Sequence, residues 1–593
     1  MDISADSGRL LRFELFELDV RSRELRKGKD RIRLQEQPFE ILRMMLERPG
    51  DVVTREELAK RLWPDGTFVD FEHSLNAAVK RLRAALGDDA DNPRFVETLP
   101  RRGYRFIAAI AANGLATMPS VSPDYTARLA VLPFTNSSGE TGQEYFSEGL
   151  TEEMILQLGR LGRGRLGVIA RTSSMSFKGG TRRAREIGEA LRADYLLEGS
   201  VRREGDRVRI TASLVETSSE IHLWTDVYDR HLTDCLSVQA DVAARIAGSL
   251  AVELLPEQPL RPSHHVGAYQ AYLKGRYYWN KPGDEGLEQA IFYFDQARES
   301  DPEFAAAYAD LARARTAQAE YYTAVPRDVL GRAREDALRA LELDPHLSDA
   351  HLAHANIVRM LDWDWAAAEA GYRQAIALNS SSEGAHRWYG SLLLALGRES
   401  EALSEAQRAV DLDPLCLVVG NSVAWGHYVV GDYEAAVGAC RRVLGMDARF
   451  LRSRRVLSAA LLQLGRSAEA VAELESAATV TPEDPVLLCW LAHAKAVRGD
   501  CAVASVLLQA LERLRERRFV PAYHLALAHM GLGRKDDVLN LLDRACEERD
   551  PSLLNVGLDH RFEPLRGDPR FAKLMERLRL PIDCVAAGLG GGS

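Results

Sequence analysis

The apolar residues of the first 90 positions recur at helical spacing in three successive segments. The first set follows Pro38, a residue favoured in the first turn of a helix, and comprises Phe39, Leu42, Met45 and Leu46. In the second segment, Thr54 followed three residues later by Glu57 has the spacing of a capping box. This pattern predicts a second helix, whose apolar face is Leu58, Leu62 and Trp63.

A third helix is predicted from about Ser74 to Leu86. Its inward face consists of Leu75, Ala78, Val79, Leu82 and Leu86, and its outward face carries Asn76, Lys80, Arg81 and Arg83. A cationic face opposite an apolar stripe suits a helix that lies in the major groove of DNA. Guanidinium groups pair bidentately with guanine there, and both kinds of cation neutralise phosphates.

Two strands with alternating apolar positions follow this helix, at Phe95 to Leu99 and at Tyr104 to Ile107. The residues between them include Arg101 and Arg102, so the pattern predicts a β-hairpin with two cations at its tip. Such a tip reaches the minor groove or the backbone of a duplex.

Residues 13–108 resemble the OmpR/PhoB-type DNA-binding domain, through the run Lys80-Arg81-Leu82-Arg83 and the hairpin residues Gly103 to Phe106. The resemblance implies an α+β winged helix-turn-helix with an N-terminal antiparallel sheet over Phe13 to Leu34, and it makes the third helix the recognition helix. Many members carry an arginine and then a glycine at the wing tip. This chain has Pro100 and Arg101, which shifts the expected minor-groove contact to Arg101 or Arg102.

The resemblance also assigns roles to individual residues. The candidate DNA-binding residues are Asn76, Lys80, Arg81, Arg83, Arg101, Arg102 and Tyr104. Family members can touch RNA polymerase through the loop that corresponds to Pro64 to Glu72, where the candidates are Asp65, Phe68 and Asp70. The alternative is that the cations of the third helix form only a solvated face, or that the winged helix docks a protein in place of DNA.

Charge restricts the predicted DNA contact to a local patch. Residues 1–110 hold 21 Lys and Arg against 20 Asp and Glu, within a chain that totals 76 against 86. One copy is therefore expected to bind DNA modestly and with strong salt dependence, which favours homodimers or tandem sites.

Composition and motifs indicate a cytoplasmic protein without a cofactor. The chain has 593 residues, of which 46% are hydrophobic and 27% charged, as in ordinary globular proteins. CadC-like and ToxR-like relatives usually follow this DNA-binding domain with a transmembrane helix. Here the apolar run from Phe106 to Met118 is interrupted and too short. The seven cysteines lack metal-binding spacing, so neither a metal site nor a cofactor is predicted.

A linker at residues 113–126 separates the DNA-binding domain, residues 1–112, from a middle domain at residues 127–255. The middle domain is expected to be an α/β sandwich, because its pattern reads β-α-β-α-β-β-β. The strand residues Ala130 to Phe134 and Leu197 to Val201 resemble the N-terminal domain of TolB. Gly179-Gly180-Thr181 lacks the lysine and the strand-loop-helix context of a phosphate-binding loop, so no enzyme activity is predicted.

From residue 267 to 582 the sequence repeats with a period of 34. Five glycines mark the period, Gly397, Gly431, Gly465, Gly499 and Gly533, each between two apolar helical patterns. This is the signature of tetratricopeptide repeats, and it predicts an all-α superhelix of seven or eight helical pairs. The 43 residues between Pro302 and Pro345 predict an insertion near Tyr321 to Asp328, and the last segment is predicted to be a cap.

A repeat superhelix presents a concave surface, whose usual role is to bind an extended peptide or a protein. The candidate partner-binding residues on first helices are Tyr308, His351, His386, Trp388 and Tyr389, although aromatic residues there also pack between repeats. Self-association and small-molecule binding are the alternatives. The sequence thus predicts a transcription regulator whose repeats control DNA binding, or else a repeat scaffold.

Overall fold

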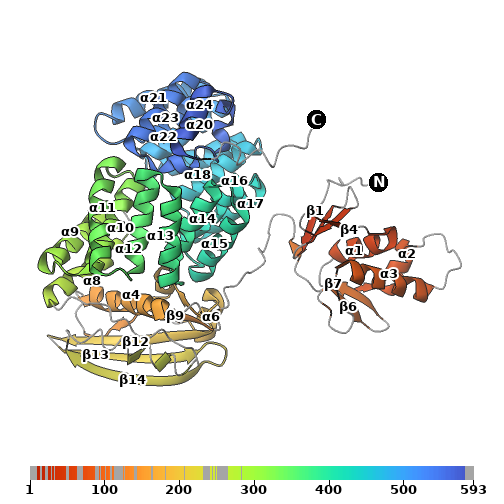
Figure 1. Cartoon of the computed structure of the whole chain (residues 1–593), viewed down its shortest axis with the longest axis horizontal. Helices are drawn as coiled ribbons and strands as arrows, with labels where there is room; N and C mark the ends of the chain where they lie inside the picture. The colour runs from red at the N-terminus through yellow and green to blue at the C-terminus, as the bar shows by residue number, and fades with distance from the viewer. Residues whose placement is uncertain are drawn as a thin grey trace. The chain divides into compact units, whose positions relative to one another are not determined.

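The structure is a computed structural model that forms two compact units, Met1–Val121 and Ser122–Ser593 (Figure 1). The residues it describes are 10–13, 16–19, 24–27, 30–32, 34–47, 52–62, 71–86, 88, 93, 95–99, 102–106, 110–111, 125, 127–138, 143–161, 165–180, 182–205, 207–231, 241–242, 245–246, 249, 265–281 and 284–580.

The first unit begins with a five-stranded antiparallel sheet in the order β4-β3-β2-β1-β8. Its strands are β1 (Leu10–Phe13), β2 (Phe16–Asp19), β3 (Glu24–Lys27), β4 (Asp30–Ile32) and β8 (Ile110–Ala111). The antiparallel sheet predicted over Phe13 to Leu34 is therefore confirmed. It starts three residues earlier, and β8 closes it from the other end of the domain.

Three helices pack beside this sheet: α1 (Glu36–Glu47), α2 (Arg55–Leu62) and α3 (Phe71–Leu86). The predicted capping box is present, since the Thr54 amide donates to Glu57 Oε2 at 2.8 Å and the Glu57 amide donates to Thr54 Oγ1 at 3.2 Å. α1 starts two residues before Pro38 and α3 three residues before Ser74. The predicted apolar stripes of α1 and α3 are buried together in one core.

The wing is a three-stranded antiparallel sheet, β5-β7-β6, formed by β5 (Val52–Thr54), β6 (Val96–Leu99) and β7 (Gly103–Phe106). The predicted hairpin is confirmed, and β5 is an addition. A Cβ atom on Gly103 would lie 2.1 Å from the carbonyl oxygen of Val53. Only glycine therefore lets β5 approach β7 at this point.

The second unit opens with a mixed sheet in the order β11-β9-β12-β13-β14, to which β10 adds by pairing with β12. β9 pairs in parallel with β11 and β12, whereas β12, β13 and β14 are antiparallel. The strands are β9 (Ala127–Val131), β10 (Thr135–Asn136), β11 (Leu166–Ile169), β12 (Tyr195–Glu204), β13 (Arg207–Glu216) and β14 (Ile221–His231). The helices are α4 (Glu144–Leu161), α5 (Arg171–Met175) and α6 (Ala184–Leu191).

Eight helical pairs follow, which agrees with the seven or eight predicted. The first four pairs are α8 (Val266–Trp279) with α9 (Asp284–Ser300), α10 (Ala305–Glu320) with α11 (Pro326–Leu343), α12 (Ser348–Ile357) with α13 (Trp365–Leu378), and α14 (Glu383–Ala395) with α15 (Glu399–Leu412). The last four are α16 (Leu417–Val429) with α17 (Tyr433–Met446), α18 (Leu451–Gln463) with α19 (Ser467–Ala478), α20 (Pro485–Arg498) with α21 (Cys501–Leu514), and α22 (Ala522–Gly531) with α23 (Lys535–Glu548). Within the described ranges, each helix is either too short or too polar to traverse a lipid bilayer.

The periodic glycines end the first helix of a pair in the left-handed conformation. Their φ angles lie between +70° and +104°. At Gly431, the amide donates to the Tyr428 carbonyl and the next amide, that of Asp432, donates to the His427 carbonyl. This pair of bonds is a Schellman motif, which satisfies the last carbonyl groups of α16 and turns the chain into α17.

The second pair contains the predicted extra residues, but they are distributed along it. α10 has 16 residues and α11 has 18, whereas α14 and α15 have 13 and 14. The turn between α10 and α11 contains Tyr322 with φ +58°, where later repeats have glycine. In the third pair the same place is taken by Trp363 with φ +53°, after the π-helical turn η3 (Val358–Asp362).

The C-terminal segment returns across the array as more than a terminal cap. It contains η4 (Pro551–Asn555), η5 (His560–Leu565) and α24 (Pro569–Leu578). Tyr322 donates its hydroxyl to Asp550 at 2.7 Å, and Trp365 Nε1 donates to the Leu578 carbonyl at 2.9 Å. Residues of the last segment thus contact turns of the second and third pairs and close the array on itself.

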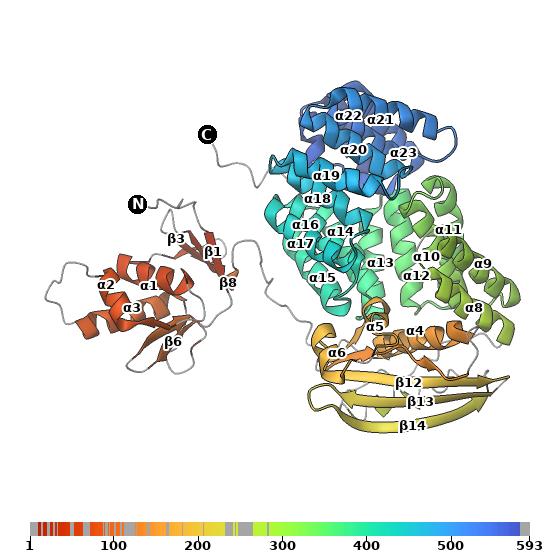
Figure 2. The ribbon, with the colours of Figure 1, turned by 180° about the vertical axis from the view of Figure 1, so that it is seen from behind.

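The sheet domain lies along the first four repeats, with α4 between the sheet and the repeat helices in both views (Figures 1 and 2). Where the sheet domain meets the end of the fourth pair, Ser173 of α5 donates its amide and its hydroxyl to Asp413 Oδ1, at 2.9 and 2.5 Å. Asp413 ends the fourth pair, and its other carboxylate oxygen, Oδ2, has no hydrogen-bond partner. Burial, followed by the nearby Glu383 carboxylate, raises the pKa of Asp413 to about 7.

The first prediction compares two glycines of the same repeat. Gly431 and Gly426 both have open space where a Cβ would be, but only Gly431 has a positive φ, of +80°. Gly431→Ala is expected to destabilise the protein by about 1 kcal/mol, because alanine is strained in the left-handed region. Gly426→Ala, inside α16, is expected to stabilise it by about 0.5 kcal/mol. Thermal denaturation measures both, and equal shifts of the two melting temperatures would contradict the backbone argument.

The second prediction concerns pH and Asp413. Because its pKa is raised in the folded state, its neutral form is favoured, and the folded protein should lose stability as pH rises from about 4 through 7. Asp413→Asn removes this titration, so the variant should be more stable than the parent by about 1–3 kcal/mol at pH 8, and the difference should shrink steadily as the pH falls towards 4. Asp447→Asn, at the equivalent position one repeat later, serves as the control. A constant difference between the Asp413 variant and the parent across this pH range would refute the prediction.

Candidate nucleic-acid interface

α3 separates its side chains into a buried stripe and an exposed cationic face. All five residues predicted to face inward are at most 3% exposed: Leu75, Ala78, Val79, Leu82 and Leu86. Asn76, Lys80 and Arg81 are exposed on the other side. The core beneath therefore fixes the direction in which these polar groups project.

Lys80 and Arg81 remain available to an anionic partner to different degrees. Lys80 makes no hydrogen bond or ion pair with any residue in the described part of the chain. Arg81 donates Nη1 to Gln35 Oε1 at 2.7 Å, a contact between exposed groups. Because this single bond leaves other N–H groups of the guanidinium facing solvent, Arg81 can still donate to phosphate or to a base edge.

Arg83 differs from the expectation that it projects outward. Its Nη2 donates to the Val96 carbonyl at 2.6 Å and to Thr98 Oγ1 at 2.8 Å, and its Nε lies 4.0 Å from Asp88 Oδ2. Only 12% of its side chain is exposed. The guanidinium therefore attaches the end of α3 to β6 and supports the wing.

Asn76 and Tyr104 meet at the junction of α3 with β7. The Tyr104 hydroxyl donates to Asn76 Oδ1 at 2.7 Å, and both guanidinium nitrogens Nη1 and Nη2 of Arg55 lie 3.4 Å from the same oxygen. Tyr104 is 2% exposed, which leaves its ring no surface for nucleic acid in this structure. Asn76 remains exposed, so it can present its amide while β7 and α2 hold its carbonyl oxygen.

Arg55 is a residue of this site that the sequence did not indicate. It opens α2, directly after Thr54, and its partners lie 21 and 49 positions away. Its guanidinium also lies 5.3 Å from the centre of the Tyr104 ring. Helical periodicity contains no signal for contacts at such separations, so only the packed domain could show this role.

The wing tip is described in part. Arg102 is exposed in the turn between β6 and β7, and its carbonyl accepts from the Arg55 amide at 3.2 Å. Arg101 lies outside the described residues. The polymerase-contact candidates Asp65, Phe68 and Asp70 lie outside them too, so these four assignments stay predictions.

Two of the partner-binding candidates are enclosed between repeat helices. His386 is 2% exposed, and its Nδ1 lies 2.5 Å from Glu405 Oε2. Tyr389 is buried as well, and its hydroxyl donates to Glu369 Oε1 at 2.8 Å and accepts from Arg373 Nε at 2.9 Å. Their polar atoms therefore connect helices within the array.

The other three candidates are half-buried. His351 Nε2 lies 2.9 Å from the Pro345 carbonyl, and Tyr308 packs in a small cluster between the second and third pairs. Trp388 lies against two guanidinium groups, 4.4 Å from that of Arg359 and 4.2 Å from that of Arg387. Of the five, Trp388 is therefore the candidate whose ring lies against two guanidinium groups.

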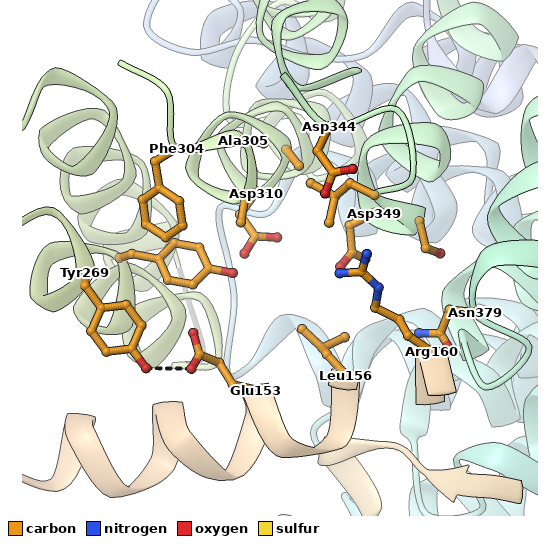
Figure 3. Close-up of a pocket in the computed structure, with 15 residues that line it drawn as sticks. Glu153, Leu156, Arg160, Tyr269, Phe304, Ala305, Asp310, Asp344, Asp349 and Asn379 are labelled. Carbon is orange, nitrogen blue, oxygen red and sulfur yellow. Dashed lines mark hydrogen bonds between the residues drawn. The ribbon is translucent and has the colours of Figure 1, made fainter. Parts of the chain in front are cut away.

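A cavity of about 60 Å³ lies where α4 faces the first repeats (Figure 3). Tyr269, Tyr272 and Phe304 contribute aromatic rings to its lining, and Glu153 and Asp310 are among the carboxylates that line it. The Tyr269 hydroxyl donates to Glu153 Oε2 at 2.6 Å, as Figure 3 shows. A space of this size is far below the roughly 300–1,000 Å³ of ligand pockets, so it suits only water or a small polar group.

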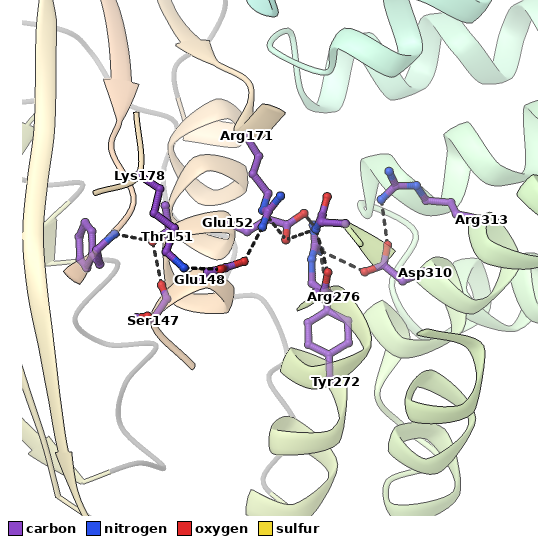
Figure 4. Close-up of polar contacts among 12 residues, drawn as sticks. Ser147, Glu148, Thr151, Glu152, Arg171, Lys178, Tyr272, Arg276, Asp310 and Arg313 are labelled. Carbon is purple, nitrogen blue, oxygen red and sulfur yellow. Dashed lines mark hydrogen bonds and ion pairs between the residues drawn. The ribbon is translucent and has the colours of Figure 1, made fainter. Parts of the chain in front are cut away.

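A buried ion network beside this cavity joins α4 to the repeats (Figure 4). Arg276 of α8 donates Nη2 to Glu152 Oε1 at 2.5 Å and Nη1 to Asp310 Oδ2 at 3.1 Å. On the other side of Glu152, Arg171 Nε lies 3.4 Å from Oε2. Burial alone would raise the pKa of Glu152, but Arg276 and Arg171 lower it below its usual value. The carboxylate is therefore ionised and bound from both domains.

Two family models match the chain, each over one domain. Residues 28–106 match "Transcriptional regulatory protein, C terminal". Residues 125–244, for which the sequence suggested a TolB-like domain, match "HilA/YgeH-like transcriptional regulator, second domain". These matches identify the first domain as a DNA-binding domain of the OmpR/PhoB type and the second as a domain like the second domain of HilA.

Relatives cover different shares of the chain. The Transcriptional regulator HilA of Salmonella typhimurium is 24% identical over 433 residues, 72% of this chain and 74% of the relative. A Rhizobium meliloti protein named "Putative adenylate cyclase 3" is 37% identical over 187 residues, 31% of this chain, so the match spans only about a third, 32%, of that relative.

Among solved structures, the DNA-binding domain of Klebsiella pneumoniae RstA, in complex with the RstA box, is 27% identical. It covers 17% of this chain and 97% of its own, with a TM-score of 0.16. The chain thus carries an OmpR/PhoB-type DNA-binding domain, a HilA-like second domain and a helical array of the tetratricopeptide type.

Proposed function

We propose that this protein is a transcription regulator that grips duplex DNA with α3 and the wing and receives its signal through the repeat array. The observation that carries the proposal is the exposed group of Asn76, Lys80 and Arg81 on one side of α3. It lies on a domain that matches the transcriptional regulatory family, and Arg102 extends the positive charge to the wing.

The supports of α3 favour a rigid reading surface. Arg83 attaches the last turn of α3 to β6, and the Tyr104 hydroxyl binds Asn76. A side chain held from behind loses less conformational entropy when it meets a base or a phosphate, so its contacts yield more affinity. DNA recognition is therefore supported by the exposed side chains and equally by the buried ones that orient them.

The second unit is proposed to be the receiver of a protein or peptide signal. Its sheet domain contacts the repeats at Glu152–Arg276 and again at Ser173–Asp413, so a change in the first four pairs reaches the sheet domain. The alternative to a protein or peptide signal is self-association of the repeat array. Contact with RNA polymerase and action in the cytoplasm, where DNA is accessible, complete the proposal.

The test of DNA binding is the double variant Lys80→Ala, Arg81→Ala in the full chain. Each lost phosphate contact should reduce the slope of log affinity against log salt by about one, and the pair should weaken binding by roughly 10- to 100-fold. Fluorescence anisotropy with a random duplex at several salt concentrations measures both quantities without a known operator.

The control for this test is Arg31→Ala in β4, which removes one charge from an exposed side chain of the same domain. It should leave the affinity within about twofold, since surface charge remote from the contact is largely screened by salt. If the double variant and the control bind the duplex equally well, α3 is not the recognition helix.

A separate experiment tests whether the second unit acts as the receiver. Arg276→Met should destabilise the second unit by about 3–5 kcal/mol, because it removes the guanidinium that the buried Glu152 and Asp310 share and leaves each with one arginine, Arg171 or Arg313. In the receiver hypothesis this change also alters DNA affinity, although the substitution lies outside the DNA-binding domain. Arg298→Met, at a half-exposed ion pair of α9, is the matched control. Lower stability with unchanged DNA affinity would separate the two units functionally and contradict the hypothesis.

A further inference from the structure

Many arginines of the repeat array, on first helices, on second helices and at the turns, hold carboxylates in short ion pairs. Examples are Arg398 with Glu369 at 2.8 Å, Arg454 with Glu473 at 2.6 Å and Arg466 with Glu469 at 2.7 Å. This is the ordinary arrangement for a guanidinium on a helical surface.

Four arginines that lack such short ion pairs among the described residues are Arg359 in η3, Arg387 in α14, and Arg452 and Arg455 in α18, which we call the inner arginine cluster. In the part of the chain that the structure describes, Arg387, Arg452 and Arg455 make no hydrogen bond and no ion pair within 4 Å. Arg359 is 3% exposed, yet its Nε and one Nη have no hydrogen-bond partner.

The Glu320 carboxylate lies near the cluster and does not neutralise it. Glu320 Oε1, at the end of α10, is 3.8 Å from Arg359. Arg387 and Arg452 also act on Glu320 electrostatically. Burial nevertheless raises the pKa of Glu320, against the effect of these three arginines. Glu320 thus lies among Arg359, Arg387 and Arg452 with its charged form disfavoured, while Arg455 is attracted by a second carboxylate, that of Asp484.

The cations repel one another in a partly desolvated space. Burial lowers the pKa of Arg455 to about 10 against the attraction of the Asp484 carboxylate, and the neighbouring Arg452 contributes to the lowering. A buried charge without a partner is costly, so an arrangement of this kind is retained where an anion can occupy it. Arg387, Arg452 and Arg455 are half-buried, which leaves the cluster open to solvent on one side.

Aromatic rings hold the guanidinium planes and leave their edges free. Arg359 and Arg387 lie against Trp388, and Arg452 lies 4.8 Å from the centre of the Tyr321 ring. Stacking on a ring stabilises a guanidinium through its face, while the N–H groups at the edge remain able to bind two acceptor oxygens at once. This is the geometry in which arginine binds phosphate or carboxylate groups.

We propose that the inner arginine cluster binds a small organic phosphate with two or more phosphate groups. Four guanidinium groups from η3, α14 and α18 require several negative charges to balance them, and a polyphosphate concentrates these charges with many acceptor oxygens. A small ligand fits better than a long peptide, because the C-terminal residues already return to the same side of the array. Tyr322, next to Tyr321, donates to Asp550 in that returning segment.

The test measures ligand binding to the full chain by calorimetry and by thermal denaturation. The probes are inorganic pyrophosphate and a nucleoside diphosphate, with citrate as a carboxylate of comparable charge and a single-stranded RNA oligonucleotide as a macromolecular competitor. Pyrophosphate and the nucleoside diphosphate are expected to raise the melting temperature. In the double variant Arg387→Gln, Arg452→Gln their affinity should fall at least tenfold.

Two controls distinguish this site from other cations. Arg466→Gln removes an exposed, paired arginine of the same array and should keep full pyrophosphate affinity. The variant Lys80→Ala, Arg81→Ala should keep it too, since the DNA-binding domain is the other surface that attracts phosphate. Because the readout uses no DNA, failure of this proposal and failure of DNA binding are independent results.

The stability of the ligand-free protein gives a second criterion. Removing Arg452 relieves repulsion, so Arg452→Gln without ligand should melt at or above the temperature of the parent protein, and pyrophosphate should no longer raise it. The proposal is overturned if pyrophosphate leaves the melting temperature of the parent protein unchanged, or if the parent and the double variant bind pyrophosphate with equal affinity. Citrate binding as tight as pyrophosphate would overturn the choice of phosphate, and a preference for RNA would overturn the small ligand.

Discussion

The structure depends on where each buried guanidinium finds a negative charge. Arg276 connects the sheet domain to the repeats because it forms ion pairs with Glu152 of α4 and with Asp310 of α10. In the returning segment, Arg561 Nη2 lies 2.6 Å from Asp559, and this carboxylate accepts from the hydroxyls of Tyr428 and Tyr523 in the array, at 3.2 Å each. Removing either partner would leave a bare charge in a poorly solvated place, so these pairs fix which surfaces meet. Among the residues that the structure describes, the arginines of the inner arginine cluster lack carboxylates at such short distances, and for that reason we propose that they bind a ligand.

The two ends of the proposed regulator use positive charge differently. On α3, the cations lie in water on a rigid helix, where their attraction for a duplex is long-ranged and strongly weakened by salt. In the repeats, the cations are stacked on rings and partly desolvated, where attraction is stronger but acts at short range. The first arrangement suits rapid association with a polymer of phosphates, whereas the second suits selective retention of a small ligand.

Some of the DNA-binding surface followed from the sequence, and some did not. The burial of Leu75 and Leu82, and the exposure of Lys80, follow from the helical period alone, because one face of an amphipathic helix must pack. The inward orientation of Arg83 and the burial of Tyr104 do not follow from the helical period, because both depend on strands that lie elsewhere in the sequence. A periodic pattern does not predict whether a long polar side chain is buried or exposed, because such a side chain can reach either surface.

The sequence by itself determined the order of the three domains, the period of 34 and the glycine that ends the first helix in the last five pairs, because these depend on local backbone preferences and on nearest-neighbour packing. Only the tertiary structure decided that the C-terminal segment returns to Tyr322 and Trp365, and that Arg359, Arg387 and Arg452 lie around Glu320. The physical reason is distance along the chain. Contacts between groups one or two hundred positions apart are selected by the shape of the closed array, and no local pattern records that shape.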